Sequence, residues 1–488
     1  SYGVVKRNRT NQMTHILSIV GLATAVHGLI SSPAQSLVSN RIPRPSNAHQ
    51  RLAATPVRDQ NYSELEGFGE PEKSPDTNWG LFWALPLAPY SRRKTIMTEV
   101  VKGKIWTFDQ LQGTLYVHVP VRMTVLKLGG SRGKGGSAGG GIQSGGLFVF
   151  APVAPTAECL GMVRALEAEH GPVKFVVLPT IAVEHKVFAG VFAQKFPKAS
   201  VWCTRDQYSF PLNLPLELLG FPLGRTFTLP EDPSQTPWAK EYPGELSYAS
   251  LGPFKAKGTG GFGETTFFHA DTKTVLVVDA VVKIPTSPPA IMLDDPRALL
   301  YHSRDDFREN VADTSATRLK GWQRVVLFGL FFMPKALTVV ETAQCVEDAK
   351  TTPQAMKSLG WGGLYPFEWD NALVGTSFRA LQKGSGLLVA PILQTLILNR
   401  NPGKVLEWAD EVAAWPFTRV IPCHLESPIR TNPRDFRNAF SFLEEGSGIG
   451  GLGRARPVPV AEDFKTLEEA EVGLIESGSL FERGKKVR

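Results

Sequence analysis

The chain contains 488 residues, of which 42% are hydrophobic and 10% aromatic. This supply of apolar side chains is enough to bury the core of one large domain or of two ordinary ones. Lysine and arginine number 53 against 46 aspartate and glutamate, giving a formal net charge of +7. Because no acidic residue precedes Asp59, the rest of the chain is close to neutral. The composition therefore predicts no nucleic-acid partner, which would require a basic stripe within a folded domain.

The first part of the chain resembles a targeting sequence. Basic residues precede an apolar run at residues 16–30, and the small-residue stretch Ser-Ser-Pro-Ala-Gln-Ser follows it, as in a signal peptide. Residues 35–58 are rich in Ser, Arg, Ala and Pro and free of acid, as in an organelle transit peptide. We therefore expect residues 1–60 to be a presequence for import into a plastid (chloroplast) through the secretory route. The alternative is a membrane anchor, although about fifteen apolar residues are fewer than the roughly twenty that a spanning helix needs.

Residues 61–78 are polar and lack periodicity, which predicts a linker before a folded domain at residues 79–446. The β-branched residues 114–128 predict strand, interrupted and split in two at Pro120. Residues 129–146 are mainly Gly and Ser, so they predict a flexible insertion without a phosphate-binding motif.

After the insertion, strand and helix signals alternate as in βαβ units. The expected strands are residues 147–152, 173–178 and 200–204, and the expected helices are residues 157–170 and 184–196. A hairpin at residues 264–268 and 274–282 follows, and the last third is mainly helical until a strand at residues 419–422. Residues 325–333 are too short for a membrane span and are expected to be buried. Residues 447–488 are predicted to form a flexible or partly helical, loosely attached tail.

Metal-ligating side chains follow three of the predicted strands, and α/β folds place their sites at strand ends. Glu184 and His185 come after the strand that ends at Leu178, with Glu184 opening a helix. The strand before Asp279 and the strand before His424 end in the same way. The four cysteines, by contrast, contain no CxxC pair and are expected to be reduced and mostly buried, so they predict neither a disulfide scaffold nor a zinc ribbon.

This arrangement resembles the metallo-β-lactamase superfamily, whose marks are THxHxDH after a strand, a Gly-His-Thr loop, an Asp at a strand end and a late His. Aligned with these marks, Glu184 replaces the Asp of THxHxDH and His185 keeps its last His, while Asp279 and His424 keep their positions. The three histidines that would bind a first metal are replaced, because their places are taken by Thr180, Ala182 and Gly260. The four positions that surround a second metal remain.

More closely, the chain is similar to the family called domain of unknown function 4336, found in cyanobacteria and plastids. The similarity rests on Leu-Pro-Thr-x-x-x-Glu-His-Lys at 178–186, Tyr-Ser-Phe-Pro-Leu-Asn-Leu-Pro at 208–215, Pro-Glu-Asp-x-Ser-Gln-Thr-Pro at 230–237, Lys-Gly-Trp-Gln-Arg at 320–324 and Ala-Pro-Ile-Leu-Gln-Thr-Leu-Ile-Leu-Asn-Arg at 390–400. It implies an α/β fold, a metallo-β-lactamase-like αββα sandwich with additional C-terminal helical elements, and a plastid address. It implies no substrate.

Two imidazoles and two carboxylates could hold one Zn or Fe ion with an open position for water. In that interpretation Glu184, His185, Asp279 and His424 are the metal ligands, and Asp279 and Glu184 are also the catalytic candidates, as ligand or general base. The alternative is structural: Glu184 favours its helix N-terminus, His185 bonds to backbone, and Asp279 and His424 form an ion pair.

Two functions follow from these alternatives. The first is a single-metal hydrolase of a small ester, thioester or phosphoester, whose partner is a small-molecule substrate. The second is a catalytically inactive protein that binds a plastid protein partner through the old cleft. Two further histidines are weaker candidates, since His269 is expected to be exposed at a hairpin turn and His302 to line a pocket with Arg304 and Asp305.

Overall fold

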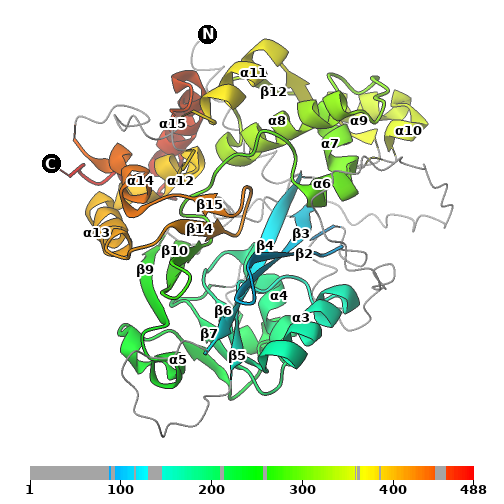
Figure 1. The fold of residues 1–488 in the computed structure, drawn as a ribbon. Coiled ribbons are helices and arrows are strands. Elements are labelled where there is room, and N and C mark those ends of the chain that lie inside the picture. Colours follow the sequence, from blue (N-terminus) through cyan, green and yellow to red (C-terminus); the bar gives the residue numbers. More distant parts are fainter. Residues whose placement is uncertain are drawn as a thin grey trace, which may run out of the picture.

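The computed structural model describes residues 87–88, 94–114, 117–129, 145–208, 214–255, 261–357, 359, 363–383, 386–445 and 458–487. The expected presequence, the linker and most of the Gly-rich insertion lie outside the described residues. The described part contains two large β-sheets with helices on their outer sides (Figure 1).

The first sheet has the strand order β1-β3-β4-β5-β6-β7-β8. The remaining strand, β2, is antiparallel to β3 and pairs with its residues 105–109. The early strands of the sheet are antiparallel, whereas β5 to β8 run parallel and are joined by crossovers. The strands are β1 (Leu87–Ala88), β2 (Ile96–Val101), β3 (Ile105–Thr114), β4 (Val117–Leu128), β5 (Gly146–Phe150), β6 (Val173–Leu178), β7 (Ser200–Cys203) and β8 (Thr226–Thr228). The crossover helices α3 (Ala157–His170) and α4 (Val183–Gln194) cover one face of this sheet, where Val163 and Phe192 join the same buried cluster as Val149 and Val176.

The second sheet has the order β15-β14-β11-β10-β9. Its strands are β9 (Leu246–Lys255), β10 (Gly261–His269), β11 (Thr274–Val277), β14 (Arg419–Pro422) and β15 (Ile429–Arg430). A separate apolar cluster joins the two sheets, since Phe148 and Phe175 of the first sheet are buried with Phe267 and Leu276 of the second. The rings of Phe148 and Phe267 lie 5.3 Å apart, centroid to centroid. The two sheets therefore share one aromatic interior.

The largest apolar cluster lies on the other face of the second sheet. Trp408 of α13 (Pro402–Ala413) packs there and donates its indole N–H to the carbonyl of Ala249 at 3.4 Å. Other elements of this layer are α6 (Ala290–Asp294), α7 (Arg297–Ser303), α8 (Ser315–Phe331), α9 (Thr342–Thr351), α10 (Gln354–Lys357), α11 (Asn371–Ala380), α12 (Pro391–Leu396), α14 (Pro433–Asn438) and the small sheet of β12 (Leu337–Val339) with β13 (Phe367–Trp369). The layers run helix, sheet, sheet, helix, which confirms the expected αββα sandwich and its additional helices.

The predicted interruption at Pro120 is wrong. β4 continues through Pro120, which lies opposite Leu111 of β3. The Pro120 carbonyl accepts a hydrogen bond from the His424 ring at 2.8 Å, so its backbone polar groups face away from β3. β5 pairs with β4 only from Thr124 onwards. The missing N–H of Pro120 therefore faces no partner strand, and the proline costs no ladder hydrogen bond.

Several predicted elements have the expected bounds. α3, β6 and β14 begin and end where the sequence predicts, and α3 begins because the Thr156 hydroxyl accepts from the Cys159 N–H. The second hairpin strand is shorter than predicted, since β11 ends at Val277. Residues 325–333 are buried in α8 and the turn that follows it, apart from the exposed Gly329, and the four cysteines are free and buried. Across the described residues, no helix is both long and apolar enough to cross a membrane.

The C-terminal segment is partly helical, as expected, but it is not loosely attached over residues 458–487. Its helix α15 (Ala461–Glu476) packs on α12 and α8 through the buried side chains Phe464 and Leu467. Glu471 of this helix pairs with Arg400 at 2.6 Å, and both side chains are almost fully buried. The many charged residues of α15 suggested a loose tail, but two of them, Asp463 and Glu471, are buried together with Phe464 and Leu467.

Candidate metal centre

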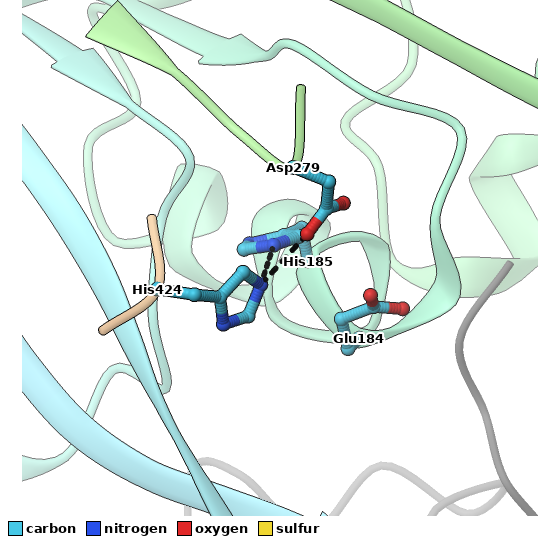
Figure 2. A group of neighbouring side chains, drawn as sticks. All are labelled: Glu184, His185, Asp279 and His424. Atoms are coloured by element: carbon cyan, nitrogen blue, oxygen red, sulfur yellow. Dashed lines mark hydrogen bonds and ion pairs between the residues drawn. The ribbon is translucent and has the colours of Figure 1, made fainter. Parts of the chain in front are cut away.

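Three loops bring Glu184, His185, Asp279 and His424 together. β6 ends at Leu178, and α4 starts at Val183 and presents Glu184 and His185 in its first turn. β11 and β14 are parallel neighbours with Val277 opposite Pro422, so Asp279 and His424 each follow a strand end at the same edge. One ligand atom from each of the four side chains can be chosen so that all lie within 4.8 Å of one another. Figure 2 shows the four side chains converging from these separate loops.

The two histidines face each other, each through its Nε2 atom. His185 Nε2 lies 3.2 Å from His424 Nε2, and His424 Nε2 lies 3.2 Å from Asp279 Oδ1 (Figure 2). The other ring nitrogen of His424, Nδ1, is 2.8 Å from the Pro120 carbonyl. Because a carbonyl only accepts, Nδ1 must carry the proton. In neutral His424, Nε2 is therefore a bare lone pair facing a carboxylate and a second imidazole, an arrangement that calls for a cation.

Burial and mutual charge shift the pKa values of these groups. Burial, helped by the nearby Asp279 charge, raises the pKa of Glu184 to about 8. Burial and the adjacent His424 lower the pKa of His185 to about 3. Burial alone would lower the pKa of His424 and raise that of Asp279, but their mutual hydrogen bond and attraction shift both pKa values in the opposite directions. The Asp279 carboxylate thus favours the charged form of His424, whereas burial disfavours the charged form of His185.

Glu184 and His185 are 5% and 2% exposed, and Glu184 Oε2 is buried without a hydrogen-bond partner. A buried carboxylate oxygen without a partner is costly, and a bound cation would compensate it. Two neutral imidazole nitrogens and two carboxylates suit Zn²⁺ or Fe²⁺ in both ligand type and number. The four residues therefore fit one such ion, and Asp279, with 23% of its side chain exposed, leaves the site open to solvent.

The family model called domain of unknown function (DUF4336) matches residues 102–442. The chain belongs to the DUF4336 family. No curated protein matches the chain.

Solved structures similar to this DUF4336 protein include flavodiiron proteins and metallo-β-lactamases. The metal-soaked Flv1 flavodiiron core from Synechocystis sp. PCC6803 is 9% identical over 71% of this chain and 60% of its own, with a TM-score of 0.33. A mutant flavo-diiron protein from Thermotoga maritima is 6% identical over 73% of this chain and 63% of its own, with a TM-score of 0.31. The metallo-β-lactamase from Pontibacter korlensis is 14% identical over 40% of this chain and 76% of its own, with a TM-score of 0.27. The DUF4336 protein thus spans less than two thirds of either flavodiiron structure.

Two of the three replaced histidine positions are visible in this DUF4336 protein. The Thr180 hydroxyl accepts from the Ala182 N–H at 3.1 Å, so it bonds within its own loop. The same loop is tied to the start of β10, because Thr265 N–H donates to the Pro179 carbonyl and Ile181 N–H to the Gly263 carbonyl. Gly260 lies outside the described residues. Neither Thr180 nor Ala182 joins the ligand group, so the described site has donors for one ion.

The sequence reasoning missed the residues that hold the ligand loops. Glu264 is completely buried and accepts the backbone N–H groups of residues 278–280, on either side of Asp279. Arg122 donates to the carbonyls of Pro422 and Leu425, on either side of His424. Gln112 donates to the Glu184 carbonyl at 2.7 Å. The available signal for Glu264 and Arg122 was a charged residue inside a strand with large apolar side chains.

The other candidate histidines lie apart from the ligand group. The expectation that His269 is exposed is wrong: it is 1% exposed, and its Nδ1 lies 2.8 Å from the Thr272 hydroxyl. His302 is fully buried among aromatic rings, 5.4 Å from that of Phe367. Arg304 packs over the rings of Tyr301 and Tyr365. His302 and Arg304 thus belong to the core of the outer helical layer, whereas His269 ends β10 of the second sheet.

Proposed function

We propose that this DUF4336 protein is a single-metal hydrolase of a small ester, thioester or phosphoester. The observation that carries the proposal is the hydrogen bond of His424 Nδ1 to the Pro120 carbonyl, which leaves Nε2 as the ring nitrogen available to a metal ion, 3.2 Å from both His185 Nε2 and Asp279 Oδ1. Metal-ligating histidines commonly donate their other ring N–H to a backbone carbonyl in this way. The preference for Zn²⁺ or Fe²⁺ follows from the two nitrogen and two carboxylate donors.

In this proposal His185 and His424 hold the ion, and Asp279 is a ligand or orients the attacking water. The ion would supply Lewis acidity and a lower pKa for a water molecule. In its ionised form Glu184 can accept the proton of that water and return it to the leaving oxygen or sulfur. A new bond forms between the water oxygen and the acyl carbon or phosphorus, and the bond to the leaving group breaks.

One observation favours a second candidate, a catalytically inactive protein that binds a plastid protein partner at the same cleft. His424 and Asp279 already form an ion pair at 3.2 Å, so a proton can satisfy the site in place of a metal ion. In that case the fold retains the geometry of the site without its chemistry, and the half-buried edge around Asp279 is a contact surface.

Metal analysis of the purified protein separates these candidates. We expect about one Zn or Fe per chain in the wild type, and loss of the metal in His185→Ala and in His424→Ala. His269→Gln is the matched control, because His269 is as buried as His185 but lies apart from the ligands. Less than about 0.2 metal ion per chain, unchanged by either ligand substitution, contradicts the hydrolase and supports the binding protein.

Activity is tested on aryl ester, thioester and phosphodiester model substrates. The metal-loaded wild type is expected to hydrolyse at least one class, and Glu184→Gln is expected to lower kcat by roughly 10²–10⁴-fold, the usual contribution of general-base catalysis. A metal-loaded wild type without activity on all three classes contradicts the hydrolase and leaves the metal site standing.

We further propose that the protein acts in a plastid, on the composition of residues 1–58. The test is a fusion of residues 1–60 to a fluorescent protein in an alga with secondary plastids. We expect fluorescence in the plastid and a fusion protein that has been shortened by cleavage of the presequence. Retention of the uncleaved fusion in a membrane would favour the anchor instead.

A further inference from the structure

Glu264 of β10 lies close to the turn that follows β11. It stands three residues before Phe267, the first β10 residue that pairs with β11, and its side chain reaches the backbone on both sides of Asp279. The Glu264 side chain has no solvent exposure. It is therefore a fully buried acid beside a second carboxylate, a placement that costs free energy unless the charge is compensated.

The compensation comes from three consecutive backbone amides. The Val278 N–H donates to Glu264 Oε1 at 2.7 Å, and the N–H groups of Asp279 and Ala280 donate to Oε2 at 2.8 and 2.9 Å. β11 has ended at Val277, so these amides lie in the turn that carries Asp279 out of the sheet. Both carboxylate oxygens are occupied by backbone, and Glu264 is not a member of the ligand group. Its hydrogen bonds to the site run through the backbone of residues 278–280.

We propose that Glu264 is the positioning residue that fixes Asp279 for metal binding. The inference rests on the proposed metal site and adds a residue to it. Three amides held on one rigid side chain restrict the backbone dihedral angles on both sides of the Asp279 Cα, and so the direction of its carboxylate. Supporting groups of this kind typically change metal affinity or activity by about 10–100-fold when replaced.

The test is Zn²⁺ titration of the metal-free full-length protein, with Co²⁺ absorption as a second probe of ligand geometry. In Glu264→Gln one carboxylate oxygen becomes an NH₂ group, so at least one of the three amides loses its acceptor. We expect a folded protein whose Zn²⁺ affinity is about 10–100-fold weaker and whose Co²⁺ spectrum is altered. If Glu264→Gln fails to fold, Glu264→Asp keeps the charge, and its shorter reach is expected to give a smaller loss.

Asp463→Asn is the matched control. Asp463 is also fully buried and accepts a backbone N–H, that of Lys335 at 2.9 Å, but it lies in α15 outside the ligand group. The same acid-to-amide change there is expected to lower the thermal midpoint and leave Zn²⁺ affinity unchanged.

A double-mutant cycle with Asp279→Asn separates positioning from general stability. If Glu264 acts through Asp279, Glu264→Gln weakens Zn²⁺ binding much less in the Asp279→Asn background than in the wild type. An equal loss in both backgrounds, or wild-type affinity in folded Glu264→Gln, overturns the role of Glu264 while the metal site stands. A wild type that binds no Zn²⁺ overturns both proposals.

Discussion

Individual residues in this site carry charges that depend on one another. Burial lowers the pKa of His185 to about 3, whereas the hydrogen bond and attraction of Asp279 raise the pKa of His424, whose Nε2 lies 3.2 Å from that of His185. The Asp279 carboxylate therefore favours a proton on His424 Nε2. A metal ion would take the place of that proton among the same donor atoms. The sequence left two interpretations open, an ion pair and a metal site. In the structure they differ only in whether a proton or a metal ion occupies the same group of donor atoms.

His269 supplies a pH-dependent prediction outside the site. Burial lowers its pKa to about 4, with a smaller contribution from Lys104 that Asp271 opposes. The unfolded chain binds this proton near pH 6.5 and the folded chain only near pH 4. The contribution of His269 to stability is therefore full above pH 6.5 and is lost as the pH falls through this window. By linkage the loss is on the order of 3 kcal/mol at most.

The measurement is urea unfolding between pH 7 and pH 4 for the wild type and for His269→Gln. The free energy of unfolding of the wild type is expected to fall more steeply with decreasing pH than that of the variant, whose side chain does not titrate. Parallel pH profiles for the two proteins would contradict the buried neutral state of His269.

At the scale of elements, β4 connects the two sheets at the site. Its Arg122 guanidinium donates to Pro422 at 2.7 Å and to Leu425 at 3.0 Å, and it pairs with Asp109 of β3 at 2.8 Å. The Pro120 carbonyl of the same strand accepts from His424. β4 thus holds the end of β14 and the turn after it, where Leu425 has a positive φ of 59°. The first sheet fixes the position of a ligand that belongs to the second.

We expect Arg122→Met to destabilise the protein by about 3–5 kcal/mol, because Asp109 and two carbonyls would remain buried without their partner. Lys350→Met is the control: its side chain is 63% exposed in an ion pair with Glu347, and a change within about 0.5 kcal/mol is expected. Chemical denaturation measures both. A cost for Arg122→Met no larger than the control would show that the β4 contacts contribute nothing to folding.

At the scale of the whole molecule, the outer helical layer includes the C-terminal helix α15. This helix packs on α12 and α8, and after it Gly484 donates to the Asn399 carbonyl and Val487 to the Leu443 carbonyl. The last residues described are therefore part of the same folded unit as the residues matched by the family model. Removing them would uncover apolar surface and leave the buried Arg400 without Glu471.

Leu467→Ala tests this packing, since Leu467 is fully buried. We expect a loss of about 2–5 kcal/mol in the free energy of unfolding, as for other large-to-small core changes. Val472→Ala on the same helix, where Val472 is 45% exposed, is expected to change stability by less than about 0.5 kcal/mol. Equal effects of the two substitutions in thermal unfolding would contradict the docking of α15.

The amino-acid sequence is sufficient to predict the bounds of α3, β6 and β14 and the four candidate ligands. Local signals suffice there: α3 has its Thr156 cap, β6 is a short apolar run, and Asp279 and His424 come at or just after the end of such a run, while Glu184 and His185 follow β6 after a short loop. The convergence of the four side chains could not be predicted in this way, because it depends on the parallel register of β11 and β14 and on the packing of two sheets. The continuity of β4 through Pro120 and the docking of α15 also depend on neighbours distant in sequence, as do the roles of Glu264 and Arg122. A residue's own sequence neighbourhood contains no information about a contact hundreds of positions away, and such contacts complete this site.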